Sequence, residues 1–335
     1  MNLKSLSVIL TTFVVFSCVL LKVGNPENPL VEKITQTAHL EFDYIILGDS
    51  RSNAAIAPRV MDSYFQKTGL SLKGHNFSSN GSDVLHHRSF IFNLLGKLKT
   101  KPKFIIWTPN PLHFDSSRKT NRLNQLYFSD LLNLTAHFAP VEQQLDLFTM
   151  LVFPPWRHKP MMANLVSDYM ARAGIRLSKV ENKVLHLILE KDPESRIYLN
   201  FDDGQEPFRV LSWKDRFDRG AEAYQHDYAK LKLGEIRFKI VEDMVKELQK
   251  NEIKLIILEL PVAPWYLKNL STLKNHKVWE SKISEMANKL GVPYINHSNF
   301  LFTLDTDFGD PGHMHLDSSL KYSEKLAQVI KEVIQ

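Results

Sequence analysis

Short apolar segments alternate with amphipathic segments in two parts of the chain, residues 41–110 and 252–335. The apolar segments span residues 44–47, 72–77, 103–107, 253–258 and 293–296. Apolar residues at helical spacing fill residues 58–69, 82–98, 277–290 and 317–334. This alternation is typical of a parallel sheet covered by helices. The pattern therefore predicts an α/β fold, a three-layer sandwich with a parallel sheet, built from these two parts of the chain.

The alternation is absent from residues 111–251, where helical patterns dominate. They span residues 124–138, 141–152 and 177–190. We interpret residues 111–251 as a mainly helical insertion in the α/β domain. Residues 154–162 within it combine basic, aromatic and thioether side chains, which suits a lid or a membrane-facing loop, or a plain connection between helices.

The N-terminus carries an uncharged, mostly apolar segment, residues 6–21, flanked by Lys4 and Lys22. This length and flanking predict a single transmembrane helix. No small-x-small cleavage site follows it, and bulky Phe16 argues against lipidation at Cys18. We therefore interpret residues 1–23 as an uncleaved signal anchor and residues 24–40 as a linker, with the rest of the chain outside the cytoplasm as part of a single-pass membrane protein. A lipase released by signal cleavage remains the alternative, with a mature N-terminus after Val23.

Composition narrows the choice of partners. The 335-residue chain has a formal net charge of +5 and one cysteine, Cys18. The charge excess is small and carries no nucleic-acid motif, so we expect no nucleic acid partner; it favours anionic partners such as phospholipid headgroups or acidic glycopolymers. A single cysteine excludes disulfides and cysteine-based metal sites. The pairs His86-His87 and His313-x-His315 lack further ligands at a recognised spacing, so we expect no metal and no cofactor.

Polar groups follow the apolar segments where the carboxyl ends of parallel strands meet. They offer the groups that acyl transfer requires. Ser50 is the candidate nucleophile, His313 the candidate base, and Asp310 the carboxylate that orients this base. The backbone N–H groups of Ser50 and Gly81 and the side-chain amide of Asn110 are candidate donors to the oxyanion. His315 is an alternative candidate for the base.

These residues occur in the order of the four sequence blocks of the SGNH, or GDSL-like, hydrolase superfamily, which this sequence resembles. The serine block G-D-S is matched by residues 48–50, with Arg51 in place of the usual leucine. The closing block begins D-P-x-H, and its matches are Asp310, Pro311, His313, Met314, Tyr322 and Ser323. His315 replaces the family's asparagine, and Ser318 and Ser319 replace its Gly-Ala pair. The resemblance covers residues 42–110 and 253–335 and implies an SGNH-type fold.

The apolar N-terminus, the G-D-S-R form and residues 260–265 look like the membrane-bound branch of this superfamily, which includes alginate O-acetylation and D-alanyl-lipoteichoic acid transfer proteins. That resemblance implies serine-dependent O-acyl transfer or ester hydrolysis on a cell-surface glycan or glycolipid, beside a membrane-bound acyltransferase. The departures at Arg51, Ser318 and Ser319 leave open a protein of another class. It would be a non-catalytic one that binds a glycan or scaffolds the acyltransferase.

Overall fold

The computed structural model describes residues 33–34, 37, 39–116, 196–198, 202–203, 205, 208–210 and 213–335. They belong to one compact unit, formed by Pro29–Lys119 and Glu194–Gln335. The expected signal anchor and residues 124–138, 141–152, 154–162 and 177–190 lie outside the described residues. Within these described ranges, no helix combines the length and the apolar character needed to cross a membrane.

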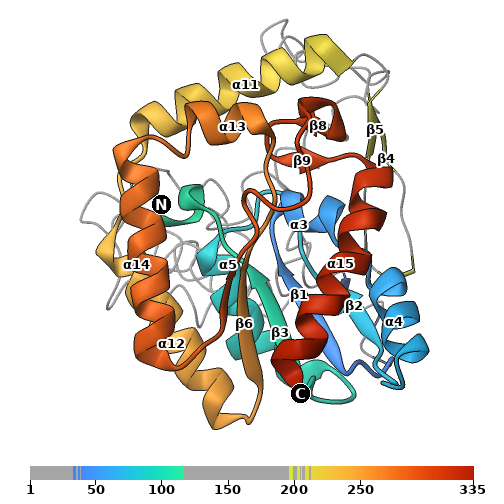
Figure 1. Ribbon diagram of the computed structural model, residues 1–335. Helices are drawn as coiled ribbons and strands as arrows, with labels where there is room; N and C mark the ends of the chain where they lie inside the picture. The colour runs from blue at the N-terminus through green and yellow to red at the C-terminus, as the bar shows by residue number, and fades with distance from the viewer. Residues whose placement is uncertain are drawn as a thin grey trace, which may run out of the picture. The chain divides into compact units, whose positions relative to one another are not determined.

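A five-stranded parallel sheet forms the centre of this unit, which confirms the predicted α/β fold with a parallel sheet (Figure 1). Its order is β2 (Gly74–Asn76), β1 (Tyr44–Gly48), β3 (Phe104–Thr108), β6 (Lys254–Glu259) and β7 (Tyr294–Asn296). Each strand overlaps an apolar segment of the sequence. Strands β1 and β3 are buried along their whole length, because helices cover both of their faces.

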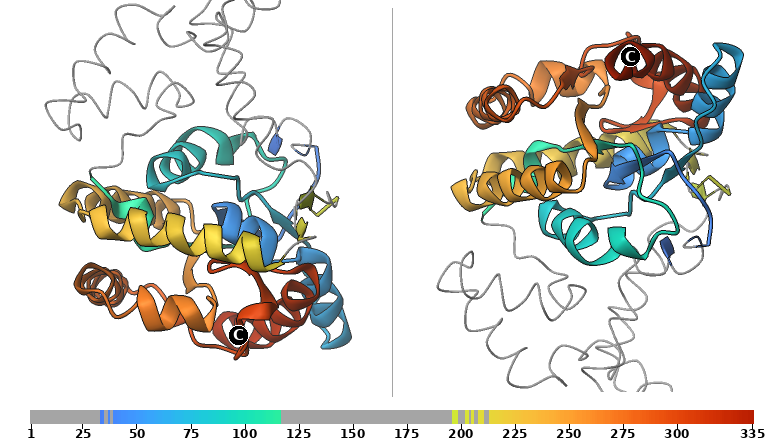
Figure 2. Two further views of the ribbon diagram at one scale, coloured as in Figure 1. Left: turned by 90° about the horizontal axis from the view of Figure 1, so that it is seen from above. Right: turned by 90° about the horizontal axis from the view of Figure 1, so that it is seen from below.

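Helices cover the sheet on its two faces (Figure 2). Helices α4 (Pro58–Lys67) and α15 (Leu316–Ile334) pack on one face, against alternate residues of three strands. These residues are Tyr44, Ile46, Phe104, Ile106, Ile256 and Leu258. Helices α5 (Val84–Ser89) and α12 (Glu235–Lys250) lie on the other face, where Trp107 Nε1 donates to His87 Nδ1 at 3.0 Å. The alternation of side chains along each strand thus separates two apolar cores.

The helix expected over residues 82–98 is less regular than its pattern predicts. Asp83 caps α5, and its side chain accepts from the backbone of Leu85 and His86. The chain then widens into a π-helical turn, Phe90–Leu94, and tightens into a 3-10 turn, Leu95–Lys97. The apolar spacing predicts the helical region but not these changes in backbone hydrogen bonding, which vary the number of residues per turn.

Four further helices and two short hairpins complete the described unit. The helices are α3 (Ser50–Ala55), α11 (Trp213–Lys230), α13 (Pro264–Asn269) and α14 (Lys274–Leu290). The hairpins pair β4 (Arg196–Tyr198) with β5 (Phe208–Val210) and β8 (Phe308–Asp310) with β9 (His313–Met314). Two 3-10 turns, Pro111–Phe114 and Asp305–Asp307, follow β3 and precede β8. Helices α11 and α12 fall within the range predicted as an insertion, and they belong to the same compact unit as the sheet.

The strand order reverses direction between β1 and β3. From β1 the chain passes to β2 on one side of it, and then to β3 on the other. In open parallel sheets such a reversal separates the loops at the carboxyl ends of the two strands and leaves room for a ligand. Ser50 follows β1 and Asn110 follows β3, so both lie at this position of the sheet.

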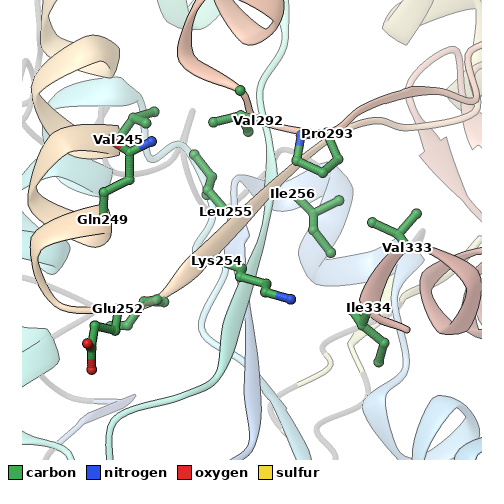
Figure 3. Close-up of a pocket in the computed structure, with 12 residues that line it drawn as sticks. Val245, Gln249, Glu252, Lys254, Leu255, Ile256, Val292, Pro293, Val333 and Ile334 are labelled. Atoms are coloured by element: carbon green, nitrogen blue, oxygen red, sulfur yellow. The ribbon is translucent and has the colours of Figure 1, made fainter.

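A pocket of about 460 Å³ lies at the amino ends of the strands, opposite the carboxyl ends that carry Ser50 and Asn110 (Figure 3). Lys254 at the start of β6, Pro293 before β7, Gln249 near the end of α12 and Ile334 at the end of α15 contribute to its lining. These positions mark the amino ends of the strands. The pocket is therefore separate from the polar residues that follow β1 and β3.

Candidate active site

Ser50, His313 and Asp310 form a continuous chain of hydrogen bonds. The Ser50 Oγ atom lies 2.8 Å from His313 Nε2, and His313 Nδ1 lies 2.7 Å from Asp310 Oδ1. A carboxylate can only accept, so the proton on the ring is placed on Nδ1 and Nε2 accepts from the serine hydroxyl. This tautomer is the one that can take a proton from Ser50. Asp310 is 3% exposed, whereas Ser50 and His313 are only partly buried.

Ser50 owes its position to the turn between β1 and α3. Asp49 is the N-cap of α3, and its Oδ1 accepts from the backbone N–H of Arg51 at 3.0 Å. Capping of this kind satisfies an N–H group that the first helical turn leaves unpaired. Ser50 is therefore the first residue of a short helix, and it follows directly from a buried strand at the carboxyl edge of the sheet.

Helix α11 contacts Asp310 at the carboxylate oxygen that His313 does not use. Arg216 forms an ion pair with Asp310 Oδ2 at 3.2 Å, and Trp213 Nε1 donates to the carbonyl oxygen of Phe308 at 2.7 Å. A Cβ atom on Gly220 would lie 2.7 Å from Asp310 Cβ, so only glycine allows this close approach. Asp310 Oδ1 accepts in addition from the backbone N–H groups of Gly312 and His313. These donors favour the ionised carboxylate and hold its orientation.

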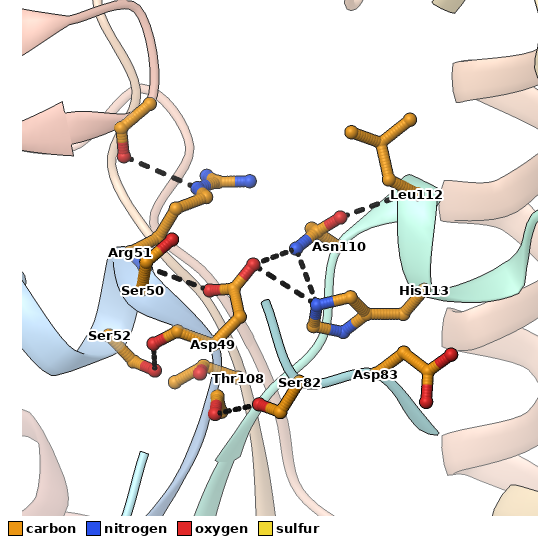
Figure 4. Close-up of polar contacts among 12 residues, drawn as sticks. Asp49, Ser50, Arg51, Ser52, Ser82, Asp83, Thr108, Asn110, Leu112 and His113 are labelled. Carbon is orange, nitrogen blue, oxygen red and sulfur yellow. Dashed lines mark hydrogen bonds and ion pairs between the residues drawn. The ribbon is translucent and has the colours of Figure 1, made fainter. Parts of the chain in front are cut away.

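The side-chain amide of Asn110 is bonded within the protein (Figure 4). Its Nδ2 donates to Asp49 Oδ2 at 2.7 Å and lies 2.9 Å from His113 Nε2, and its Oδ1 accepts from the N–H of Leu112 at 2.9 Å. Asn110 thus caps the 3-10 turn that follows β3. Its Nδ2 is the predicted oxyanion donor, and it points at a carboxylate next to the nucleophile.

His113 belongs to this network and was missed by the sequence reasoning. Its Nε2 lies 3.1 Å from Asp49 Oδ2. Burial alone would raise the pKa of Asp49, but the hydrogen bond with His113 and nearby positive charges hold this pKa well below its usual value. A sequence signal for His113 existed. Residues 110–113 read N-P-L-H and residues 310–313 read D-P-G-H, with the same spacing from the first residue to the histidine.

The turn that contains Gly81 is tied to the end of β1. The carbonyl oxygen of Gly48 accepts from the N–H of Ser79 at 3.0 Å and from the hydroxyl of Ser82 at 2.7 Å. Gly81 is exposed and has a φ of 70°, a left-handed conformation that favours glycine. The turn therefore lies beside the residues that lead into Ser50.

Behind this turn, His87 is held neutral. Burial lowers the pKa of His87 to about 3. Trp107 Nε1 can only donate, so His87 Nδ1 accepts from it and His87 Nε2 donates to Ser82 Oγ at 3.1 Å. His87 therefore has a structural role in the site, because it supports the hydroxyl that fixes the end of β1.

His315, the alternative candidate for the base, has no hydrogen bond to Ser50. It is the N-cap residue of α15, and its backbone N–H donates to the carbonyl oxygen of Asp307 at 3.1 Å. His313, not His315, contacts Ser50. In the described part of the chain, no group of three or more histidine, cysteine, aspartate or glutamate side chains is arranged to hold a metal ion.

Strand order and helical layers define a doubly wound α/β protein with a Ser–His–Asp arrangement at the carboxyl edge of its sheet. One family model matches residues 30–330, and its description is protein of unknown function (DUF1574). This match spans most of the chain, so the chain belongs to the DUF1574 family.

Two solved structures are similar to this chain. One is a candidate acylhydrolase from Bacteroides fragilis, with 10% identity and a TM-score of 0.41 over 91% of this chain and 97% of that chain. The other is a GDSL-like lipase from Bacteroides thetaiotaomicron, with 10% identity and a TM-score of 0.39 over 91% of this chain and 98% of that chain. Because both identities and both TM-scores are low, neither likeness carries a conclusion about activity. No curated protein matches the chain.

Proposed function

We propose that this chain is a serine-dependent ester hydrolase or O-acyl transferase that works through an acyl-enzyme on Ser50. The observation that carries the proposal is the partly exposed Ser50 hydroxyl, 2.8 Å from a histidine whose other ring nitrogen is held by a buried aspartate. Nucleophile, base and orienting carboxylate within hydrogen-bond reach are the arrangement that activates a serine for attack on an acyl group.

In the proposed acylation, Ser50 Oγ attacks the ester carbonyl as its proton passes to His313 Nε2. Asp310 holds the ring and stabilises the charge that His313 gains, helped by the ion pair with Arg216 that fixes its second oxygen. When the tetrahedral intermediate collapses, His313 returns the proton to the leaving alcohol. Ser50 is then left as an acyl ester.

The second half of the reaction distinguishes hydrolase from transferase. Water or a sugar hydroxyl attacks the acyl-enzyme, loses its proton to His313, and releases Ser50 as the free alcohol. With water the product is an acid, and with a sugar hydroxyl it is a new ester. Both outcomes use the same protein groups.

We place this chemistry on a cell-surface glycan or glycolipid, outside the cytoplasm, at the membrane and beside a membrane-bound acyltransferase. The support is the apolar segment of residues 6–21 and the resemblance to the membrane-bound SGNH branch. The full chain should remain in the membrane fraction after washing with alkaline carbonate, and a chain without residues 1–23 should be released. Release of the full chain by carbonate would contradict the anchor.

A serine-reactive fluorophosphonate tests the nucleophile directly. The full chain should be labelled once, at Ser50, and should hydrolyse para-nitrophenyl acetate. Ser50→Ala should lose both properties. Ser116→Ala is a matched control, because the Ser116 hydroxyl donates to the backbone of Lys232. Full esterase activity in a folded Ser50→Ala variant would exclude this chemistry. So would a folded wild-type chain that the probe does not label.

A non-catalytic glycan-binding protein or scaffold is the second candidate. One observation favours it: Asn110 Nδ2 donates to Asp49 and is not directed at an empty oxyanion site. This candidate predicts that the Ser50→Ala variant binds the glycan or the acyltransferase as well as the wild-type chain does, and that the phosphonate does not react with folded wild-type protein. The labelling experiment therefore separates the two functions.

A further inference from the structure

Arg51, the residue after Ser50, has a buried guanidinium group without a carboxylate partner. The residue is 6% exposed. Its Nε donates to the carbonyl oxygen of Gly312 at 3.3 Å, and this is the one dashed line from its guanidinium in Figure 4. No aspartate or glutamate of the described residues lies within ion-pair distance of it. Burying a charge without an oppositely charged partner costs free energy of folding. The buried guanidinium of Arg51 therefore does not serve stability, which favours a role in ligand binding.

Asp49 attracts Arg51 only through space. One Asp49 oxygen accepts from the backbone N–H of Arg51, and the other faces Asn110 and His113. Neither oxygen is bonded to the guanidinium. The field of Asp49 helps to retain the positive charge, and the terminal nitrogens of Arg51 keep donors that Asp49 does not use.

Three tyrosines surround the guanidinium without neutralising it. Arg51 Cζ lies 5.7 Å from the ring centroid of Tyr266, a cation–π contact. Burial raises the pKa values of Tyr224, Tyr228 and Tyr266, so all three remain uncharged at neutral pH. The hydroxyls of Tyr228 and Tyr266 are bonded to each other. The Tyr224 hydroxyl has no hydrogen bond to a described residue, so it can donate to a ligand.

Arg51 and Tyr224 converge beside the proposed base. A Cβ atom on Gly312 would overlap the Tyr224 hydroxyl and lie 3.3 Å from Arg51 Nε. Gly312 immediately precedes His313, and Arg51 immediately follows Ser50. Two donors, one of them a buried cation, are thus gathered next to the two groups that would react with an ester.

We propose that Arg51 and the Tyr224 hydroxyl form a subsite for an anionic group, a carboxylate or a phosphate, carried by the ester that Ser50 attacks. The proposal rests on the proposed function and adds the charge of the substrate to it. A guanidinium presents parallel N–H donors that match two oxygens of such an anion, and hydrogen bonds between charged groups are stronger than neutral ones. An anion bound there would give the guanidinium a directly bonded counter-charge, which Asp49 does not provide.

Two matched pairs of esters test the subsite and distinguish the source of the anion. The para-nitrophenyl esters of pentanoate and of glutarate differ by a terminal carboxylate on the acyl side. The acetyl esters of glycerol and of glycerol phosphate differ by a phosphate on the alcohol side. We expect the wild-type chain to prefer the anionic member of one pair, and Arg51→Gln to lower the anionic-to-neutral ratio of kcat/KM at least about tenfold, mainly through KM.

The variants separate a specific subsite from a general loss of charge. Arg51→Lys keeps the charge and should retain part of the preference. Arg219→Gln removes an exposed charge from the same helix as Tyr224 and should leave the ratio unchanged. An unchanged ratio in Arg51→Gln overturns the proposal. So does an equal loss for neutral and anionic esters, because Arg51 would then act on the reacting carbonyl. If Arg51→Gln does not fold, as judged by circular dichroism, Tyr224→Phe replaces it and should lower the same ratio severalfold.

A binding measurement keeps this inference separate from the proposed function. Ser50→Ala protein should bind glutarate or glycerol phosphate in calorimetric titration, and the double variant Ser50→Ala, Arg51→Lys should bind it more weakly. If the wild-type chain hydrolyses no ester but this binding is observed, the catalytic proposal fails and the subsite stands. If Ser50 is labelled and active but neither anion binds, the subsite is excluded and the catalytic proposal stands.

Discussion

His313 Nε2 lies 2.8 Å from Ser50 Oγ, although 263 positions separate the two residues in the sequence. Ser50 is the first residue of α3, directly after a buried strand, and His313 begins the second strand of a short hairpin that α11 braces. Helix α3 and strand β9 pack against each other, and this contact brings the two side chains together. The distance between the two side chains therefore depends on elements remote from both, and these elements can be altered separately.

Replacing His313 by alanine should nearly abolish esterase activity, with a fall in kcat/KM of about a thousandfold or more, because the proton acceptor for Ser50 is removed. His315→Ala is the matched comparison. It removes a side chain that does not contact Ser50, so kcat/KM should change less than about threefold. Steady-state hydrolysis of para-nitrophenyl acetate measures both. A larger loss in His315→Ala would assign the base to His315.

Gly220→Ala should impair the site from a distance. The added Cβ would lie 2.7 Å from Asp310 Cβ and 3.1 Å from Pro311 Cδ, so α11 or the β8–β9 hairpin must move. Overpacking of this kind costs about 1–3 kcal/mol, and misplacement of Asp310 should lower kcat at least about tenfold.

Gly96→Ala is the control for that change, because a Cβ at position 96 meets nothing within 4 Å. It should leave activity and stability nearly unaltered. Urea denaturation and steady-state kinetics test both variants. Full activity of Gly220→Ala would show that the position of Asp310 tolerates a shift of the helix.

Asn110→Ala tests whether the amide leaves Asp49 during the reaction. If Nδ2 binds the oxyanion in the transition state, kcat should fall about a hundredfold with little change in KM. His113→Gln, which removes another neighbour of Asp49, should lower stability more than kcat. A fall in stability of Asn110→Ala without a fall in kcat would assign Asn110 to capping and support of Asp49 alone.

Glu259→Gln should make the protein more stable in alkaline solution. Glu259 is 5% exposed, and burial raises its pKa from 4.5 to about 7, against the hydrogen bond from Tyr294. The folded state holds this proton more tightly than the unfolded state does, so the stability that the proton contributes is present below pH 4.5 and is lost as pH rises through about 7. Glutamine keeps an acceptor for the Tyr294 hydroxyl and cannot ionise.

The difference in free energy of unfolding between Glu259→Gln and the wild-type chain should therefore increase with pH, by roughly 2–3 kcal/mol between pH 4.5 and pH 8. Urea denaturation at a series of pH values measures this difference. Taking a difference between the two proteins cancels the contributions of the other titrating groups. A difference independent of pH would show that Glu259 has an ordinary pKa.

Much of the site followed from local sequence, and the residues that were missed differ in whether the sequence carried a signal for them. Residues 48–50 and 310–313 were predicted from polar residues after apolar segments, and the structure brings their side chains together. His113 was missed although residues 110–113 repeat the spacing of residues 310–313. Arg216 and Tyr224 were missed because no helix was predicted over α11, and nothing in its sequence says which loop it covers.

The sequence alone determined the strands, the helices α4, α14 and α15 and the parallel sheet, because apolar periodicity and turn residues act over a few positions. Tertiary structure decided which face of α11 meets Asp310, that Asn110 bonds to Asp49, and that the guanidinium of Arg51 is buried without a carboxylate partner among the described residues. These three outcomes depend on contacts between segments far apart in the chain. Their energies come from close packing and burial, which no local pattern records.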